Sequence, residues 1–231
     1  MSADVRIRPL GDAAWTIELP DRIDPAVNSR ALELASRIET AGLSGVRDIV
    51  VAYRTVTVFI DPLGEGAALV EAALQRIAAE TPADRGVAGA HVEVPVCYDQ
   101  ACGPDLDDVA AFAGCAVEDV IARHLALTYR VYLVGFVPGF AYMASVDPTI
   151  AAPRRAAPRL KVPAGSVAIA AGQTGIYPAE TPGGWHIIGR TPVRPFDPER
   201  AEPFLFHPGD EVRFTRIDHA AFSRASQWEA R

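Results

Sequence analysis

Residues 129–143 read YRVYLVGFVPGFAYM, residues 153–178 read PRRAAPRLKVPAGSVAIAAGQTGIYP, and residues 180–194 read ETPGGWHIIGRTPVR. In these runs short β-branched or aromatic stretches alternate with Gly and Pro, a pattern typical of short strands joined by tight turns. We expect Pro182-Gly183 to form a type II turn and residues 172–175 to reverse the chain. Gly139 is expected to let the backbone approach a ligand closely. Many short strands with few helices favour a closed β-barrel.

The stretch from Tyr129 to Arg194, called the basic stretch below, differs in charge from the rest of the chain. It holds seven cations against the carboxylates of Asp147 and Glu180, a charge near +5, whereas the whole chain carries −7. A local excess of positive charge in an acidic protein favours a site for an anion. The alternative is a solvated loop whose arginines pair with acids elsewhere.

The chain has 21 arginines and a single lysine, Lys161, which lies in the basic stretch. An ammonium group is a compact point charge whose pKa can shift, whereas guanidinium is a planar fork that stays protonated. We therefore predict Lys161 to be a catalytic or phosphate-directed residue, with chance retention as the alternative. Arg159 and Lys161 flank Leu160, so in an extended segment both point to one side and could hold a carboxylate or phosphate between them.

Composition indicates an ordinary globular protein, with 49% apolar and 22% charged residues. No apolar run approaches the roughly 20 residues that span a bilayer, and the N-terminus lacks the apolar core of a signal peptide. We expect a cytoplasmic protein without membrane contact, and the acidic balance argues against a nucleic acid partner.

Cys97, Cys102 and Cys115 match no zinc or CxxC spacing, so free thiols and no metal site are predicted.

Residues 1–84 are predicted to form a small α+β domain. Strand patterns at 5–10 and 15–19 precede a helix that begins at Asp24-Pro25, with Asp24 as N-cap and Pro25 at the first helical position. Two further strands, at 46–52 and 55–60, precede a second helix at 65–80. The order ββαββα favours an antiparallel α+β sandwich. Residues 81–86, TPADRG, are the predicted linker.

Residues 85–231 are predicted to form the second domain, which contains the β-barrel. A strand is expected at 91–97, followed by helices that begin near Gly103-Pro104 and at Val117. The strands of the basic stretch come next, and a strand at 211–217 and a terminal helix complete the domain.

The three runs quoted at the start lie within the segments 124–143 and 152–192. These segments, with CYDQACGPDLDDVA at 97–110 and FHPGDEVRF at 206–214, resemble the family of 5-oxoprolinase B subunits. Its members are also called allophanate hydrolase subunit 1, KipI-type sensor-kinase inhibitors and carboxyltransferase domain C and D proteins. The resemblance implies an α+β domain followed by a cyclophilin-like β-barrel. It also implies action with an A subunit and a homologous larger C subunit in the ATP-dependent opening of 5-oxoproline to glutamate. ATP with Mg²⁺ would belong to the complex, with none bound tightly by this chain alone.

Three residues are predicted to be catalytic: Lys161, His124 and Glu180. His124 lies in a motif of the resemblance, but on an apolar helix face that is typical of a core histidine. Glu180 is a possible base or partner of a ligand ammonium group, or else an ion-pair partner of Arg190. The residues predicted to bind substrate or phosphate are Arg159, Ser166, Gln173, Thr174, Tyr177, Arg130 and Arg190. Several of them could instead serve ordinary turn chemistry.

The sequence contains no Ser-His-Asp order, no metal-ligand spacing and no phosphate-binding glycine loop. We therefore expect a chain that is inactive alone and completes its site with partner proteins. The leading hypothesis is the B subunit of an ATP-dependent 5-oxoprolinase with a small amide or lactam substrate. The alternatives are a regulatory protein that inhibits a sensor histidine kinase, and a carboxyltransferase subunit that processes allophanate or urea-like amides.

Overall fold

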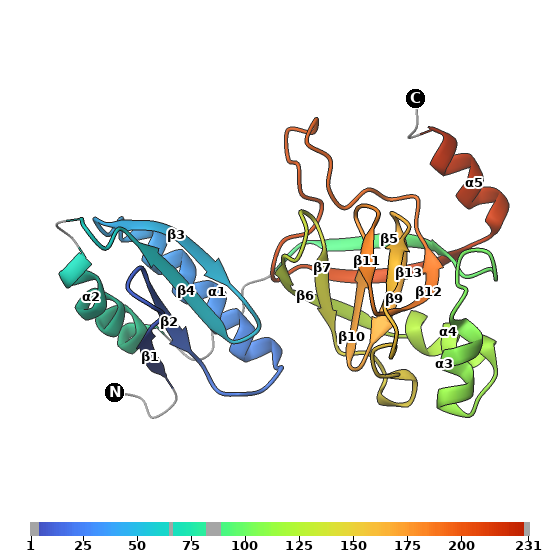
Figure 1. Cartoon of the computed structure of the whole chain (residues 1–231), viewed down its shortest axis with the longest axis horizontal. Coiled ribbons are helices and arrows are strands. Elements are labelled where there is room, and N and C mark those ends of the chain that lie inside the picture. The colour runs from blue at the N-terminus through green and yellow to red at the C-terminus, as the bar shows by residue number, and fades with distance from the viewer. Residues whose placement is uncertain (1–4, 65–66, 82–88, 229–231) are drawn as a thin grey trace. The chain divides into compact units, whose positions relative to one another are not determined.

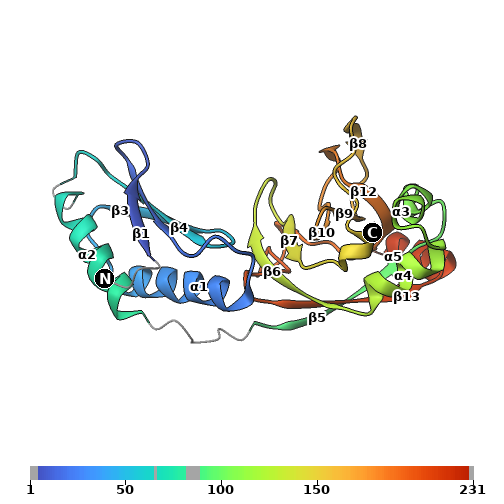
Figure 2. The ribbon, with the colours of Figure 1, turned by 90° about the horizontal axis from the view of Figure 1, so that it is seen from below.

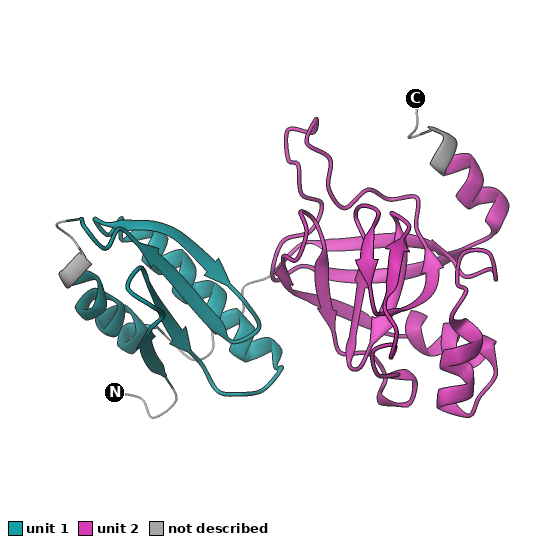
Figure 3. Ribbon diagram, viewed as in Figure 1, with its two compact units in different colours: residues 1–88 teal, residues 89–231 magenta. Residues whose placement is uncertain are grey.

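The computed structural model of the chain describes residues 5–64, 67–81 and 89–228. The chain divides into two compact units, Met1–Ala88 and Gly89–Arg231, which Figure 3 shows in separate colours. The predicted domain boundary between residues 84 and 85 lies outside the described residues. None of the described helices has the length and apolar character needed to cross a membrane.

The first unit is a four-stranded antiparallel sheet with two helices, so the predicted ββαββα order is confirmed. The sheet order is β1-β2-β4-β3, and Figure 2 shows α1 running alongside it. The elements of this unit are β1 (Arg6–Pro9), β2 (Ala14–Glu18), α1 (Pro25–Thr40), β3 (Val46–Val51), β4 (Thr55–Ile60) and α2 (Ala67–Glu80).

The start of α1 is fixed by its cap, as its sequence predicts. The Asp24 carboxylate accepts hydrogen bonds from the backbone amides of Ala26 and Val27, at 2.8 and 3.2 Å. Apolar residues spaced at helical period on α1, among them Leu34 and Ile38, are buried against alternate strand residues such as Val56 and Val58. Burial of each large apolar side chain contributes about 1.5–3 kcal/mol, and this core holds the two layers together.

The second unit is built on a closed barrel, as predicted. Its strands follow each other around the barrel in the order β10-β7-β6-β13-β5-β12-β9, and the parallel pair of β5 and β13 joins the two ends of the unit's sequence. Figure 1 shows these strands. They are β5 (His91–Cys97), β6 (Thr128–Val134), β7 (Ala141–Ala144), β9 (Ser166–Ala170), β10 (Gln173–Ile176), β12 (His186–Arg190) and β13 (Glu211–Ile217).

Helices and a separate two-stranded ribbon complete the second unit. β8 and β11 pair only with each other within the described sheets, and Figure 2 shows β8 standing out from the barrel. The predicted free thiols are confirmed at all three cysteines. The remaining elements are α3 (Leu106–Ala113), α4 (Val117–Leu125), the short 3₁₀ helix η1 (Pro148–Ile150), β8 (Arg159–Val162), β11 (Thr181–Gly183) and α5 (His219–Trp228).

Two turn predictions were wrong. Pro182 and Gly183 lie in β11, which pairs with β8. Pro182 falls at the register shift between Thr181 and Gly183, where no hydrogen bond from its backbone nitrogen is needed. The chain reversal expected at residues 172–175 occurs instead at Ala171-Gly172, because Gln173 already pairs with Ala170. Ala171 has φ of 51°, as a two-residue hairpin loop requires.

Candidate active site

A pocket of about 230 Å³ opens on the second unit next to the β8–β11 ribbon. We call it the aromatic pocket, because rings supply most of its walls. All its residues come from the three runs of sequence that determine the barrel. The lining residues are Phe136, Phe140, Tyr142, Arg154, Pro158, Tyr177, Pro182, Gly183, Gly184 and Trp185.

Phe140 is the centre of the aromatic wall. Its ring centroid lies 4.7 Å from that of Tyr142, 5.1 Å from that of Tyr177 and 5.4 Å from that of Trp185. The contacts with Tyr177 and Trp185 are edge to face, an arrangement that the ring quadrupoles favour. Phe140, Tyr177 and Trp185 are buried, so the wall is a fixed surface.

Phe136 lies at the mouth of this pocket in a costly backbone conformation. It has φ of 70°, and its side chain is 62% exposed while its ring contacts Phe140 edge-on at 5.8 Å. A bulky residue in the left-handed region costs about 1–3 kcal/mol, and such strain is concentrated at binding and catalytic sites. An exposed aromatic side chain held in this way points to a function at the pocket.

Gly139, in the same loop, was predicted to let the backbone approach a ligand. In the structure it allows close packing within the chain instead. Its φ is 85°, and a Cβ at this position would lie 2.5 Å from the Cβ of Phe196. The close neighbour is therefore another segment of the chain. Glycine is required because both the conformation and the space exclude a side chain.

Two tyrosines supply hydroxyl groups to the aromatic pocket. Burial raises the pKa of Tyr142 and of Tyr177 above the ordinary phenol value, although nearby Arg154 acts in the opposite direction on both. A hydrogen bond between the Tyr177 hydroxyl and the Trp185 backbone also offsets part of the effect at Tyr177. Both phenols therefore stay protonated at neutral pH and can donate hydrogen bonds.

Arg154 is the one charged side chain among the described residues that line the aromatic pocket. Within the described residues it has neither an ion pair nor a hydrogen bond, whereas the other cations of the basic stretch are engaged. Arg155 and Arg159 bind Asp105, Lys161 binds Glu180, and Arg190 donates to the Ala164 carbonyl. Arg130 and Arg194 also have interaction partners.

The segment that carries Arg154 is fixed on both sides. His186 Nε2 lies 3.0 Å from the Pro153 carbonyl oxygen, and the Arg155 backbone amide donates to the Gly184 carbonyl at 2.8 Å. Neighbouring side chains in an extended chain point in opposite directions. Because Arg155 points to Asp105, Arg154 points the other way and reaches the pocket.

Asp105 is the acid that organises this region, and sequence reasoning missed it. Its carboxylate, 2% exposed, accepts two hydrogen bonds from Arg159, at 2.6 and 2.7 Å, and one from Arg155 at 2.8 Å. The Ile187 backbone amide donates a fourth, at 2.7 Å. Asp105 stands at the N-cap of α3 but makes no cap bond, because both oxygens are already used. The sequence shows only an acid at a helix start, where a cap is the ordinary role.

Asp105, Asp108 and His186 place one potential metal-ligand atom each within 4.8 Å of one another. Asp105 is already neutralised by Arg155 and Arg159, and Arg155 also contacts Asp108 at 3.2 Å. A metal ion here would meet two guanidinium groups at contact distance. We therefore assign this cluster a structural role in holding the Arg154 segment.

His124, a predicted catalytic residue, lies in the barrel core. Tyr98 Oη is 2.8 Å from its Nδ1, and Thr174 Oγ1 is 3.0 Å from its Nε2. Thr174 donates its hydrogen to the Ala168 carbonyl, so it accepts from Nε2–H, and Nδ1 accepts from Tyr98. Burial lowers the pKa of His124 to about 3. These contacts describe a neutral core histidine, the second of the two roles that the sequence left open.

Lys161 and Glu180, the other predicted catalytic residues, form an ion pair on the β8–β11 ribbon. Their charged atoms are 3.1 Å apart, and the side chains are 78% and 58% exposed. Glu180 thus pairs with Lys161 and not with Arg190. Arg159 is bound to Asp105, so the structure does not place Arg159 and Lys161 around a common anion. Their exposure leaves Lys161 and Glu180 accessible to a partner protein, and their catalytic role stays a prediction.

The predicted binding residues are divided between the pocket and the barrel wall. Tyr177 lines the aromatic pocket. Ser166 and Thr174 are fully buried in β9 and β10, and half-buried Gln173 begins β10. Arg130 is half-buried on β6, and the Arg190 guanidinium lies 5.4 Å from the Phe222 ring centroid, next to α5. Of these residues, only Tyr177 therefore joins the site found in the structure.

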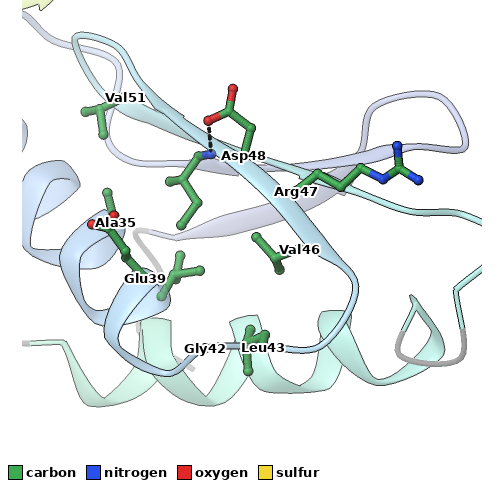
Figure 4. A pocket seen from close by; sticks show the side chains of 10 residues that line it. Ala35, Glu39, Gly42, Leu43, Val46, Arg47, Asp48 and Val51 are labelled. Atoms are coloured by element: carbon green, nitrogen blue, oxygen red, sulfur yellow. Dashed lines mark hydrogen bonds between the residues drawn. The ribbon is translucent and has the colours of Figure 1, made fainter.

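A larger hollow of about 580 Å³ lies in the first unit between the end of α1 and β3, and Figure 4 shows it. Two of its charged groups are used locally, because Arg47 pairs with Asp61 at 2.7 Å and the Asp48 carboxylate accepts from the Ile49 amide at 2.8 Å. The dashed line in Figure 4 marks the second of these bonds. Among the described lining residues this leaves the Glu39 carboxylate, a single group and not the convergent polar set of a substrate site.

Comparison with known proteins identifies the family. Residues 5–206 match the family described as carboxyltransferase domain, subdomain C and D. The chain belongs to this family. It is 38% identical to the 5-oxoprolinase B subunit of Bacillus subtilis (strain 168), over 98% of this chain and 100% of that protein. It is 40% identical to the 5-oxoprolinase B subunit of Escherichia coli O157:H7, over 89% of this chain and 93% of that protein.

Solved structures support the fold of this carboxyltransferase C and D chain. The crystal structure of the protein TTHA0988 is similar with a TM-score of 0.76 at 39% identity, over 92% of this chain and 40% of that chain. The urea amidolyase of Kluyveromyces lactis has a TM-score of 0.79 at 19% identity, over 95% of this chain and 15% of that one. The second likeness shows the fold alone. The whole aromatic pocket lies within the residues that match the family.

Proposed function

We propose that the protein is the B subunit of an ATP-dependent 5-oxoprolinase, which opens 5-oxo-L-proline to L-glutamate together with other subunits. The observation that carries this proposal is the match along the full length of a protein named as the B subunit of 5-oxoprolinase, at 38% identity over 98% of the chain. Similarity over the whole length supports a shared role better than similarity of fold, which recurs among proteins of unrelated function.

The chemistry of the reaction explains the need for ATP. A five-membered lactam resists hydrolysis, and phosphorylation of the amide oxygen makes its carbon–nitrogen bond easier to break. Positive groups stabilise the charge that develops during phosphoryl transfer and during attack on the lactam carbon. The proposed contribution of this chain is a small pocket with Arg154, which has no ion-pair partner among the described residues. ATP with Mg²⁺ is assigned to the complex as a whole.

Partner proteins are part of this proposal. The chain spans 40% of the length of TTHA0988, so a relative carries this fold together with other sequence. Lys161 and Glu180 are exposed on the β8–β11 ribbon, where they could complete a site with a second protein. We assign the missing parts to an A subunit and to a larger C subunit.

Purified alone, the chain should release no glutamate from 5-oxo-L-proline and ATP, because its described residues form only part of a site. Addition of both the A and the C subunits from the same organism should restore release, and omission of any one of the three proteins should abolish it. Glutamate is measured by coupled dehydrogenase assay. Robust release by this chain alone, or by the A and C subunits without it, would contradict the proposed division of labour.

A further inference from the structure

We propose that the aromatic pocket binds a small ring-shaped monocarboxylate, with Arg154 on the carboxylate and the ring against the wall around Phe140. The identity of the ligand rests on the proposed function, for which the ring is the lactam of 5-oxo-L-proline. Neither the family match nor the names of the relatives assign a ligand to these residues.

Charge is the first argument. Arg154 lines the pocket without a partner among the described residues, while Arg155 and Arg159 are neutralised by Asp105. No carboxylate is among the described residues of the pocket lining, so one positive charge remains for a ligand with one negative charge. A guanidinium group matches a carboxylate in two parallel hydrogen bonds, which makes arginine suited to this recognition.

Size and shape are the second argument. A cavity of about 230 Å³ lies below the roughly 300–1,000 Å³ of sites for drug-sized ligands. The aromatic rings of Phe140, Tyr142, Tyr177 and Trp185 line it, and such an apolar wall suits a small ring. A nucleotide is too large for this space, whereas a single five-membered ring with a carboxylate is of suitable size.

Hydrogen bonding supplies the third argument. Tyr142 and Tyr177 line the pocket and remain protonated, so each can donate to the carbonyl oxygen of a lactam. The pocket then offers a cation to one end of the ligand and neutral donors to the other. A simple hydrocarbon ring would use neither feature.

The pocket is also held in place before any ligand arrives. The Pro153 carbonyl is bound by His186, and Arg155 is bound by Asp105 and by the Gly184 carbonyl. These bonds restrict the backbone on both sides of Arg154, so its side chain is the main part that must be ordered. Preorganisation of this kind lowers the entropic cost of binding.

The test compares Arg154→Gln with wild type in binding of 5-oxo-L-proline, measured by calorimetry on the full chain and by KM in the reconstituted complex. Loss of a charge-assisted hydrogen bond should weaken binding roughly 10- to 100-fold. The matched control is Arg213→Gln, an exposed arginine on β13 outside the pocket, which should bind like wild type. Thermal unfolding should be unchanged in both variants, since Arg154 has no ion pair or hydrogen bond to lose among the described residues.

The ligand provides a second control. The primary amide of 5-oxo-L-proline keeps the ring and loses the charge, so it should bind weakly and equally to wild type and Arg154→Gln. Equal binding of the acid to wild type and Arg154→Gln would overturn the proposal. Binding of the amide as tight as that of the acid, or tighter binding of an uncharged prolyl peptide, would also overturn it.

Failure of this assignment can be told apart from failure of the proposed function. If the complex releases glutamate and Arg154→Gln leaves KM unchanged, the pocket assignment is wrong and the function stands. The complex could instead release no glutamate while the chain binds another cyclic carboxylate, such as N-acetyl-L-pipecolate, in a way that depends on Arg154. In that case the pocket assignment stands and the function is wrong.

Discussion

Replacing Asp105 with alanine is expected to lower the free energy of unfolding of the second unit by about 3–5 kcal/mol, the range for breaking a buried ion pair by removing one partner. The carboxylate is almost fully buried and accepts four hydrogen bonds from Arg155, Arg159 and Ile187. Its loss leaves the half-buried Arg159 guanidinium without its counter-charge, and leaves Arg155 with only the exposed Asp108 carboxylate. It also leaves the buried Ile187 amide without its acceptor.

Urea denaturation of the full chain measures this effect, with Asp108→Ala as the matched control. Asp108 is 61% exposed and its ion pair with Arg155, at 3.2 Å, lies at the surface, so its removal should cost under about 1 kcal/mol. Asp105→Ala should also weaken binding of 5-oxo-L-proline, because the Arg154 segment loses its anchor. An Asp105→Ala protein within about 1 kcal/mol of wild type would show that the cluster does not hold this region.

Acid should destabilise the second unit well above the pH at which carboxylates titrate, and His124 is the cause. Burial lowers its folded-state pKa to about 3, whereas an unfolded histidine titrates at 6.5. Below 6.5 the unfolded chain therefore binds a proton that the folded chain does not, and this favours unfolding. The stability due to neutral His124 is complete above pH 6.5 and falls by up to about 1.4 kcal/mol per pH unit below it.

The comparison with His124→Phe isolates this effect. Phenylalanine preserves the stacking on Phe214, whose ring centroid is 4.7 Å from that of His124, and removes the titrating group. The variant should be less stable at neutral pH, because Tyr98 and Thr174 lose a partner. The difference from wild type should shrink by roughly 1.5 kcal/mol between pH 6.5 and 5. Parallel stability curves for the two proteins over this range would exclude His124 as the source.

Local sequence signals predict much of the fold. The Asp24 cap, the strand at His91–Cys97 and the strand at Glu211–Ile217 are all set by residues near in sequence, and the structure has them where the pattern predicts. Pro182-Gly183 has the sequence of a turn, yet its pairing with β8, about twenty residues earlier, decides its conformation. Long-range pairing of this kind overrides a turn propensity, so a single sequence does not disclose it.

The candidate site was harder to predict, because pairing between distant residues decides which cation is free. Composition singles out Lys161 as the sole lysine, but its charge meets Glu180 at the surface. Arg154 is one of several arginines in the sequence. It differs from Arg155 and Arg159 only because Asp105, fifty or more positions away, binds those two. Tyr177 was found because its place beside a glycine turn is visible locally.

Consumption of 5-oxo-L-proline by the complex of this chain with the A and C subunits is the most direct measurement of its function. Supplied with ATP and Mg²⁺, the complex should form glutamate and ADP in equal amounts from 5-oxo-L-proline, and neither product when urea or allophanate replaces it. Turnover of urea or allophanate in place of 5-oxo-L-proline, or ADP formation without glutamate, would contradict the assignment.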